Sequence, residues 1–171
     1  GGRLAYRRIR GMGSEHDRDP DGHGTHVHGI ACGGPTDAIH RGLAPASRQI
    51  AVRVFDPSSE SAQHTDILEA LQVAVAAGAD VINLSLGGPD GANSLLSVVC
   101  GALVEQDEAL VVAAAGNDGH ARPRGGVDSP ANARSVLAVA ALESNGRIAS
   151  FSSRGRPDSS DERLGKPDLA A

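Results

Sequence analysis

Aromatic residues are almost missing from this chain of 171 residues, which has no tryptophan, one tyrosine and two phenylalanines. The length suits one domain with a core of its own. Without aromatic side chains, that core has to be built from Val, Ile, Leu and Ala. Such small side chains allow helices to pack closely on a sheet.

The chain also lacks basic clusters and long apolar runs. Its 16 Lys and Arg are outnumbered by 21 Asp and Glu, for a net charge of −5, which argues against nucleic acid or an anionic membrane as a partner. No apolar run approaches the roughly 18 residues of a membrane-spanning helix, and the first residues show no signal-peptide core. We therefore expect a soluble chain without an export signal.

Cysteine is equally scarce. Cys32 and Cys100 are too few for a disulfide framework, and their spacing is not that of C-x-x-C zinc or redox motifs. We expect two separate, partly buried thiols.

Alternating strand and helix patterns predict an α/β domain. The expected elements are helices over 23–32, 65–78 (with Thr65 as N-cap and Gly78 as stop) and 94–106, and strands over 49–55, 80–85, 109–115 and 136–141. This order predicts a parallel sheet with right-handed crossovers and helices on both faces. Residues 1–22 are polar and predict an irregular lead-in loop, with the core of a single domain over 23–171.

Ligands of such sheets bind beyond the carboxyl ends of the strands. The loops after Phe55, Ser85 and Ala115 are therefore the candidate binding region. No nucleotide-binding glycine motif occurs there, so a nucleotide-binding domain is a remote alternative.

Three histidines, His23, His26 and His28, follow aspartates at positions 17, 19 and 21. The aspartates match the first half of an EF-hand loop, but the twelfth position is His28 rather than Glu, and Pro20 interrupts the pattern. Histidines spaced i, i+3 and i+5 on one helix cannot converge on one zinc ion. We therefore expect no metal site, and solvated or core histidines stay open as an alternative.

The segment over 22–29, Gly-His-Gly-Thr-His-Val-His-Gly, resembles the histidine motif of the subtilisin-like serine peptidases. Further segments resemble blocks of this family, in the same order and with similar spacing: 42–54, 80–88, 111–119, 135–141, 149–155 and 166–170. The resemblance implies a three-layer α/β architecture and hydrolysis of peptide bonds by an Asp-His-Ser mechanism without a cofactor. It also implies peptide or protein substrates and secretion.

The same resemblance implies roles for individual residues. His23 aligns with the general base and Asn117 with the side-chain donor of the oxyanion hole. Two segments align with substrate-binding positions. The edge that pairs with an extended substrate corresponds to Ser85, Leu86 and Gly87. A wall of the pocket for the residue before the scissile bond corresponds to Ala114, Ala115 and Gly116. Without the family, Asn117 is equally typical of a turn.

The resemblance is incomplete at both ends. The family's triad runs in the order Asp, His, Ser, and neither the D-[ST]-G context of the aspartate nor the G-T-S context of the serine occurs here. We expect a partial peptidase domain whose aspartate and serine lie in missing segments, so that the isolated chain is inactive or nearly so. The alternative is a noncatalytic, subtilase-like peptide-binding module. His28 stands where the family has a small residue, and 33–41 shows no calcium loop.

Three structural expectations follow from the alignment with the family. The Ser129–Pro130 bond is cis, although only about 5–6% of X-Pro bonds are. His23 begins its helix with its ring toward the loops after Ser85 and Asn117.

The third expectation concerns specificity. Asp118 falls at the rim and Asp128 at the base of the pocket for the residue before the scissile bond, and Asp21 borders the adjoining pocket. These carboxylates predict a preference for Arg or Lys before the cut.

Overall fold

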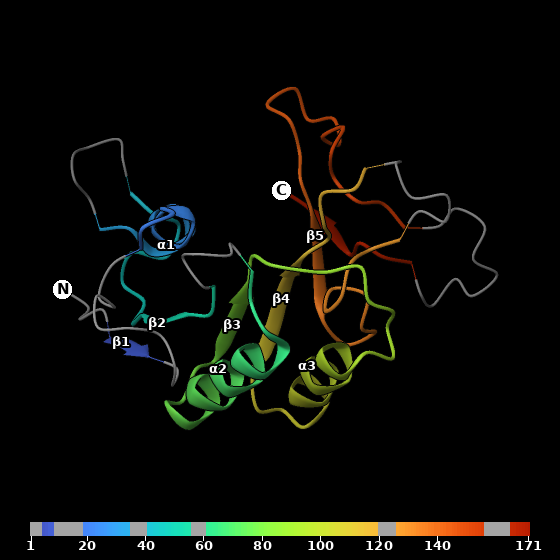
Figure 1. Ribbon diagram of the computed structural model, residues 1–171. Coiled ribbons are helices and arrows are strands. Elements are labelled where there is room, and N and C mark those ends of the chain that lie inside the picture. Colours follow the sequence, from blue (N-terminus) through green and yellow to red (C-terminus); the bar gives the residue numbers. More distant parts are fainter. Residues whose placement is uncertain (1–4, 9–18, 35–40, 56–60, 120–125, 156–164) are drawn as a thin grey trace. The chain divides into compact units, whose positions relative to one another are not determined.

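The computed structural model describes residues 5–8, 19–34, 41–55, 61–119, 126–155 and 165–171 (Figure 1). The chain divides into two compact units, residues 1–79 and 80–171. No described helix combines the length and apolar character needed to cross a membrane.

The first unit contains β1 (Ala5–Arg8), α1 (His23–Cys32), β2 (Ile50–Arg53) and α2 (His64–Ala76). β1 and β2 pair in parallel, with Ala5 opposite Ile50 and Arg8 opposite Arg53. The expectation of an irregular loop over 1–22 is therefore wrong for β1. Its backbone hydrogen bonds come from β2, some 45 residues later in the chain by this register, so the local polar pattern did not reveal the strand.

The helices of the first unit follow the predicted boundaries closely. α1 spans the predicted residues, and α2 buries Ile67 and Leu71. The N-cap of α2 is Gln63 rather than the predicted Thr65, which lies inside the first turn. Gly78, with φ of 74°, follows the C-cap and donates its N–H to the Val75 carbonyl at 2.9 Å, which confirms its role as the helix stop.

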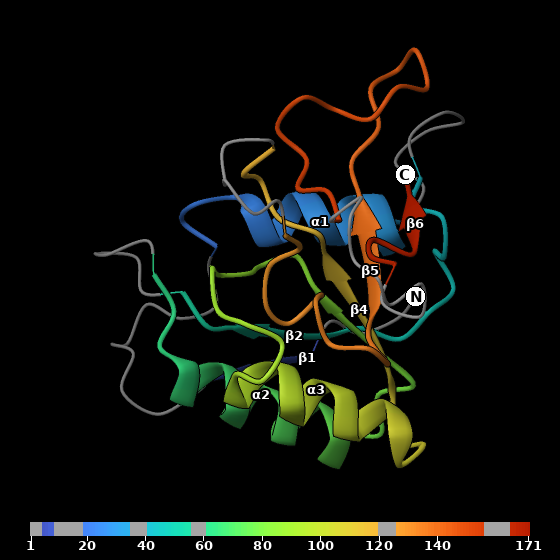
Figure 2. The same ribbon diagram turned by 90° about the vertical axis from the view of Figure 1, so that its right-hand side faces the viewer.

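The second unit is built on a four-stranded parallel sheet. Its strands are β3 (Val81–Leu84), β4 (Leu110–Ala114), β5 (Leu137–Ala140) and β6 (Leu169–Ala170), in the order β3-β4-β5-β6. α3 (Leu95–Glu105) connects β3 to β4 and packs on β4 (Figure 2). Ser94 caps α3 by accepting the Ser97 N–H. The predicted strands and helix are confirmed, each shorter by a residue or two at its ends.

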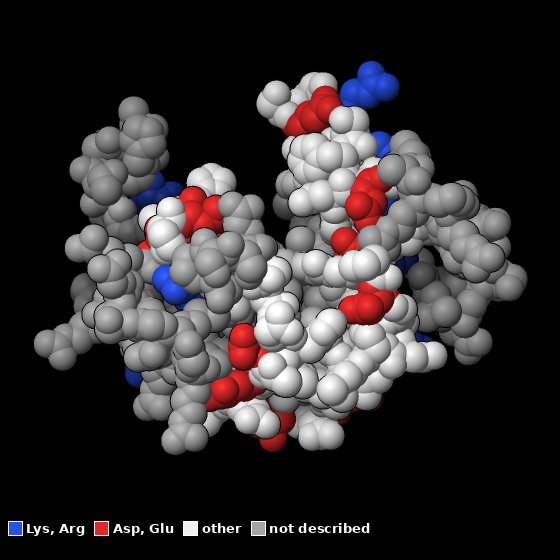
Figure 3. Space-filling model, in the orientation of Figure 1, with Lys and Arg blue, Asp and Glu red and all other residues white. Residues whose placement is uncertain are grey.

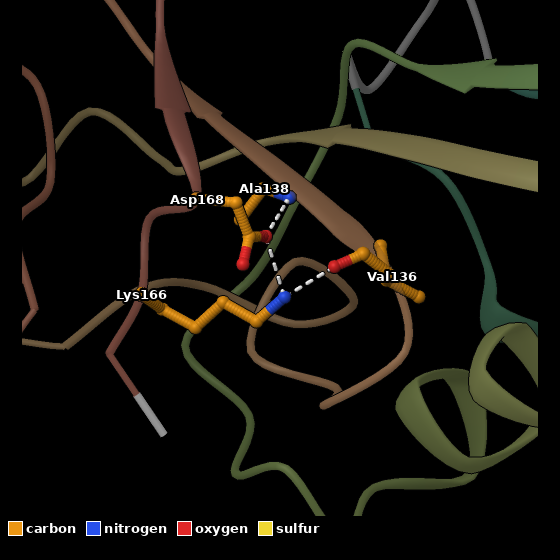
Figure 4. Close-up of polar contacts among 4 residues, drawn as sticks. All are labelled: Val136, Ala138, Lys166 and Asp168. Atoms are coloured by element: carbon orange, nitrogen blue, oxygen red, sulfur yellow. Dashed lines mark hydrogen bonds and ion pairs between the residues drawn. The ribbon is translucent and has the colours of Figure 1, made fainter. Parts of the chain in front are cut away.

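β6 was not predicted, because two residues are too few for a periodic pattern. A polar clasp holds it to β5 (Figure 4). The Asp168 carboxylate accepts the Ala138 N–H at 2.7 Å and the Lys166 ammonium at 2.6 Å, and the ammonium also donates to the Val136 carbonyl. This clasp belongs to the Lys-Pro-Asp segment that the family resemblance singled out.

The core of the second unit consists of small aliphatic side chains, as the composition predicted. The buried apolar residues there are Ile82, Leu84, Leu96, Cys100, Ala109, Val111, Ala113, Ala115, Val127, Ala131, Ala133, Val136, Ala138, Ala140 and Ala149.

Candidate active site

A pocket of about 290 Å³ opens at the carboxyl edge of β3 and β4, within the second unit. The residues that line it are Ser85, Leu86, Gly87, Gly88, Pro89, Ala114, Gly116, Asn117, Asp118 and Asp128. Two of the three loops that the sequence selected, those after Ser85 and Ala115, thus form one pocket. Eight of the residues that the sequence analysis assigned to the site line it.

Ala115 is the predicted pocket residue that does not line this cavity. Its side chain is buried, and its N–H donates to the Val139 carbonyl at 2.9 Å. Side chains alternate along a strand, so the neighbour of the exposed Ala114 points into the core. Ala115 contributes through its carbonyl, which accepts the Asp128 N–H at 2.9 Å.

Two glycines let the Asp128 carboxylate lie against the pocket walls. Gly116 has φ of 110°, and a Cβ added to it would lie 2.3 Å from Asp128 Oδ2 and 2.8 Å from Ser153 Oγ. A Cβ on Gly87 would lie 3.2 Å from the Asp128 Cβ. Only glycine permits both the backbone angle at 116 and this close approach. Asp128 is 7% exposed in this position.

The loop that carries Asn117 is tied to the segment over 150–153. The Ser153 N–H donates to the Gly116 carbonyl at 2.8 Å, and the Ser153 hydroxyl accepts the Asp118 N–H at 3.1 Å. Gly119 donates its N–H to the Phe151 carbonyl at 2.8 Å. The backbone on both sides of Asn117 is therefore fixed, while its side chain is exposed at the pocket. Ser153 was not singled out individually, although it belongs to the recognised block over 149–155.

The pocket wall that contains Gly88 is joined to the segment after Asp128 by a short antiparallel bridge. Gly88 and Ser129 exchange two backbone hydrogen bonds of 3.0 and 2.9 Å. The Ser129–Pro130 bond is cis, which confirms that prediction, and Lys166–Pro167 is cis as well.

In the first unit, His23 is the first residue of α1, as predicted. Gly22 precedes it with φ of 84°. The Asp21 carboxylate accepts the His23 N–H at 3.2 Å, and the Asp19 carboxylate accepts the Thr25 N–H at 2.6 Å. These two carboxylates thus cap a helix N-terminus, where the macrodipole favours negative charge.

Opposing effects act on the pKa of Asp19. Burial raises it, but hydrogen bonds from Thr25 and from the Gly22 N–H, together with the charge of His23, outweigh burial and hold the pKa below its ordinary value of 3.8. Asp17 lies outside the described residues. Among the residues that are described, no group of three His, Cys, Asp or Glu side chains is placed to hold a metal ion.

The described surface agrees with the negative net charge. In Figure 3, acidic side chains are spread more widely than basic ones over the described part of the face shown. The acidic residues of the pocket itself are Asp118 and Asp128.

The sequence of this chain is similar to those of known proteins. The model of the subtilase family matches residues 6–171. Subtilisin DY of Bacillus licheniformis is 39% identical over 143 residues, which are 84% of this chain and 51% of that protein. Subtilisin E of Bacillus subtilis (strain 168) is 39% identical over 138 residues, which are 81% of this chain and 35% of that protein.

Two solved protease structures are also similar to this chain. A mutant of the protease domain of PatA matches with a TM-score of 0.75 and 32% identity, over 91% of this chain and 56% of that one. A psychrophilic protease matches with a TM-score of 0.69 and 33% identity, over 85% of this chain and 50% of that one.

These structures define the class: an α/β fold of the subtilisin-like type, with a parallel sheet and helices. The chain belongs to the subtilase family of serine proteases, which confirms the family resemblance. The chain spans about half the length of subtilisin DY and of the two solved proteases, and about a third of subtilisin E.

Proposed function

We propose that this chain is part of a serine endopeptidase that hydrolyses peptide bonds, with the orienting aspartate and the nucleophilic serine outside it. The observation that carries the proposal is the exposed Asn117 side chain on a fixed loop at the pocket formed by the ends of β3 and β4. Its substrates are peptides or proteins, whose extended backbone pairs with the edge over 85–87.

In this mechanism, His23 removes the hydroxyl proton of the serine as the serine oxygen attacks the scissile carbonyl carbon. The carbonyl oxygen becomes an oxyanion, and the Asn117 side-chain N–H donates to it. His23 then returns the proton to the leaving amine, and an acyl-enzyme remains for hydrolysis by water. The prediction that the His23 ring faces the loops after Ser85 and Asn117 belongs to this proposal.

The Asn117 amide suits the oxyanion role because it is neutral. A neutral donor on a rigid loop stabilises the charge that develops in the transition state without an equally strong interaction with the ground state. Hydrogen bonds from the N–H groups of residues 118 and 119 hold the loop, so little reorganisation is needed during reaction.

We also propose that the pocket prefers Arg or Lys before the scissile bond. The Asp128 carboxylate is 7% exposed and packs against Gly116 in the pocket wall, and Asp118 lies at the same pocket. A cation that enters such a site forms a charge-assisted, largely desolvated pair, which is stronger than a surface pair. Asp21 borders the adjoining subsite in the family alignment, and its assignment rests on that alignment.

The proposed activity is tested by expressing this chain alone and as part of the full-length protein encoded by its gene. We expect peptide hydrolysis by the full-length protein and little or none by the isolated chain, because the triad acts as a unit. Asn117→Ala is expected to lower kcat by about 10²–10³-fold. Asn145→Ala, in an exposed turn of the same unit, is the matched control.

A full-length protein that binds peptides without cleaving them would contradict the peptidase proposal and support the noncatalytic peptide-binding module. The specificity proposal has a separate outcome. If kcat/KM favours Leu or Phe over Arg before the cut, and Asp128→Asn leaves that ratio unchanged, the acidic pocket has no role in selection. Asp107→Asn, which removes a charge at the other end of β4, is the matched control.

We propose an extracellular location for the full-length protein. Among the relatives, the minor extracellular protease Epr of Bacillus subtilis (strain 168) is 35% identical over 81% of this chain. Immunodetection in culture medium and in washed cells of the source organism tests the location, and retention in the cells would contradict it.

A further inference from the structure

A cluster of four polar side chains, two of them buried and two half-buried, lies beside the pocket within the second unit. Ser94 and Ser97 come from the start of α3, and Ser129 and Asn132 come from the turn that follows Asp128. The Ser129 hydroxyl lies 2.9 Å from that of Ser94 and 2.8 Å from that of Ser97. The Ser97 hydroxyl donates to Asn132 Oδ1 at 2.6 Å.

This hydroxyl cluster joins three segments of the chain. Asn132 Nδ2 donates to the Asp90 carbonyl at 2.8 Å, and the Asn132 N–H donates to the Asp128 carbonyl at 2.9 Å. Ser129 carries the backbone bridge to Gly88, which lines the pocket. The start of α3, the segment over 88–90 and the base at Asp128 are therefore all connected through the side chains and backbone of these four residues.

Burial of these hydroxyls lowers the stability of the fold unless each of them has a hydrogen-bond partner. Few arrangements of the cluster meet this condition, so its geometry is specific. Ser97 and Ser129 are each 1% exposed, next to a core made mainly of alanine and other small aliphatic residues. A buried hydroxyl without a partner is destabilising, whereas connected hydroxyls strengthen one another. Asn132 Oδ1 can only accept, so the single proton of Ser97 restricts how the remaining hydroxyls can be arranged. Apolar side chains of similar size would fill the space without such restrictions.

We propose that Ser97, Ser129 and Asn132 are positioning residues that set the separation between the pocket wall at Gly88 and the base at Asp128. They contact no substrate themselves. By fixing the width of the pocket, they determine how well a large side chain before the scissile bond is held. This inference rests on the proposed peptidase function and identifies residues outside the site that the family alignment assigns.

The first test uses Ser97→Ala in the full-length protein, with peptides that have either Gly or Arg before the scissile bond. We expect kcat/KM to fall by about tenfold for the Arg peptide, mainly through KM, and by less than about twofold for the Gly peptide, which does not fill the pocket. A variant that is merely destabilised loses activity toward both peptides equally, and that result would overturn the inference.

Ser135→Ala is the matched control. The Ser135 hydroxyl also bonds to α3, donating to Glu105 at 2.5 Å, but at the opposite end of the helix. This control variant is expected to leave the Arg-to-Gly ratio of kcat/KM unchanged. A shift of that ratio equal to the shift in Ser97→Ala would assign the effect to α3 as a whole and contradict the role of the hydroxyl cluster.

The second test does not depend on catalysis. Amide hydrogen exchange in the isolated chain is compared between the original sequence and Ser97→Ala. We expect exchange of the Gly88 and Ser129 amides to rise about tenfold, with the Val112 amide of β4 unchanged. Unchanged exchange at Gly88 and Ser129, or an equal rise at Val112, would overturn the inference. If the full-length protein cleaves no peptide, the proposed function fails, and the exchange result still decides the positioning role.

Discussion

The two regions that carry His23 and Asn117 differ in how well they are packed. Helix α1, which begins with His23, has no buried residue. The loop of Asn117 is attached to a core in which Val111, Val136 and Cys100 are at most 1% exposed. Carboxylates cap the first turn of α1, and the N–H groups of Leu43 and Ala44 donate to its last carbonyls. The Asn117 loop has backbone bonds to a neighbouring segment and a polar cluster beside it. We therefore expect the oxyanion side of the proposed site to be preorganised within 80–171, whereas α1 has no buried side chain in the described part of the chain. The following predictions test this difference.

The largest contrast is expected between the two thiols. Cys100 is fully buried, and burial raises its pKa to about 12, whereas Cys32 on α1 is only half-buried. At pH 8, the raised pKa alone lowers the thiolate fraction of Cys100 about a thousandfold from that of an ordinary cysteine. Alkylation with iodoacetamide, followed by mass spectrometry, should modify Cys32 and spare Cys100 until the protein is denatured. Equal labelling rates in the folded chain would contradict the contrast.

Gly116→Ala is expected to lower the free energy of unfolding by about 2–4 kcal/mol. The added Cβ would collide with the Asp128 carboxylate and the Ser153 hydroxyl, and φ of 110° is unfavourable for alanine. Gly91→Ala is the control, since a Cβ there meets no atom within 4 Å. Urea unfolding measures both. A loss below 0.5 kcal/mol at Gly116, roughly the scale of a surface change, would show that the pocket wall is adaptable rather than rigid.

Val111→Ala and Ile30→Ala compare the packing of the two units directly. Val111 is inaccessible, so removing two methyl groups should cost about 2–3 kcal/mol of unfolding free energy. Ile30, on α1, is 57% exposed, and its replacement should change stability by less than about 0.5 kcal/mol. Thermal and urea unfolding give both values. A cost above 1 kcal/mol at Ile30, roughly that of buried methylenes, would mean that α1 buries this side chain in solution.

The smallest effect is expected at the α1 cap, and it depends on pH. The folded-state pKa of Asp19 is below 3.8, so its carboxylate stabilises α1 fully above that pH, and the stabilisation is lost as the pH falls through the folded-state value. A cap of this kind contributes up to about 1 kcal/mol. The Thr25 amide should therefore lose protection from hydrogen exchange in acid. In Asp19→Asn this acid-dependent step should be absent, and its persistence would assign the loss to another group.

Sequence reasoning succeeded where local patterns and the family alignment carry the information. α1, the stop of α2 at Gly78 and the cis bond before Pro130 were all predicted. It failed at β1 and β6, whose few residues become strands only through pairing with distant segments.

The sequence by itself determined the family, the order of the elements from α1 to β5, and which loops follow those strands, because helix signals, apolar runs and motif blocks are properties of neighbouring residues. Only the tertiary structure decided that Asp128 packs against Gly116 and that Ser97, Ser129 and Asn132 form one cluster. Asp128 lies 12 positions from Gly116, and Ser97 lies more than 30 positions from Ser129 and Asn132. Their contacts arise from backbone close approach and from complete hydrogen bonding in a core of small side chains, neither of which leaves a local pattern.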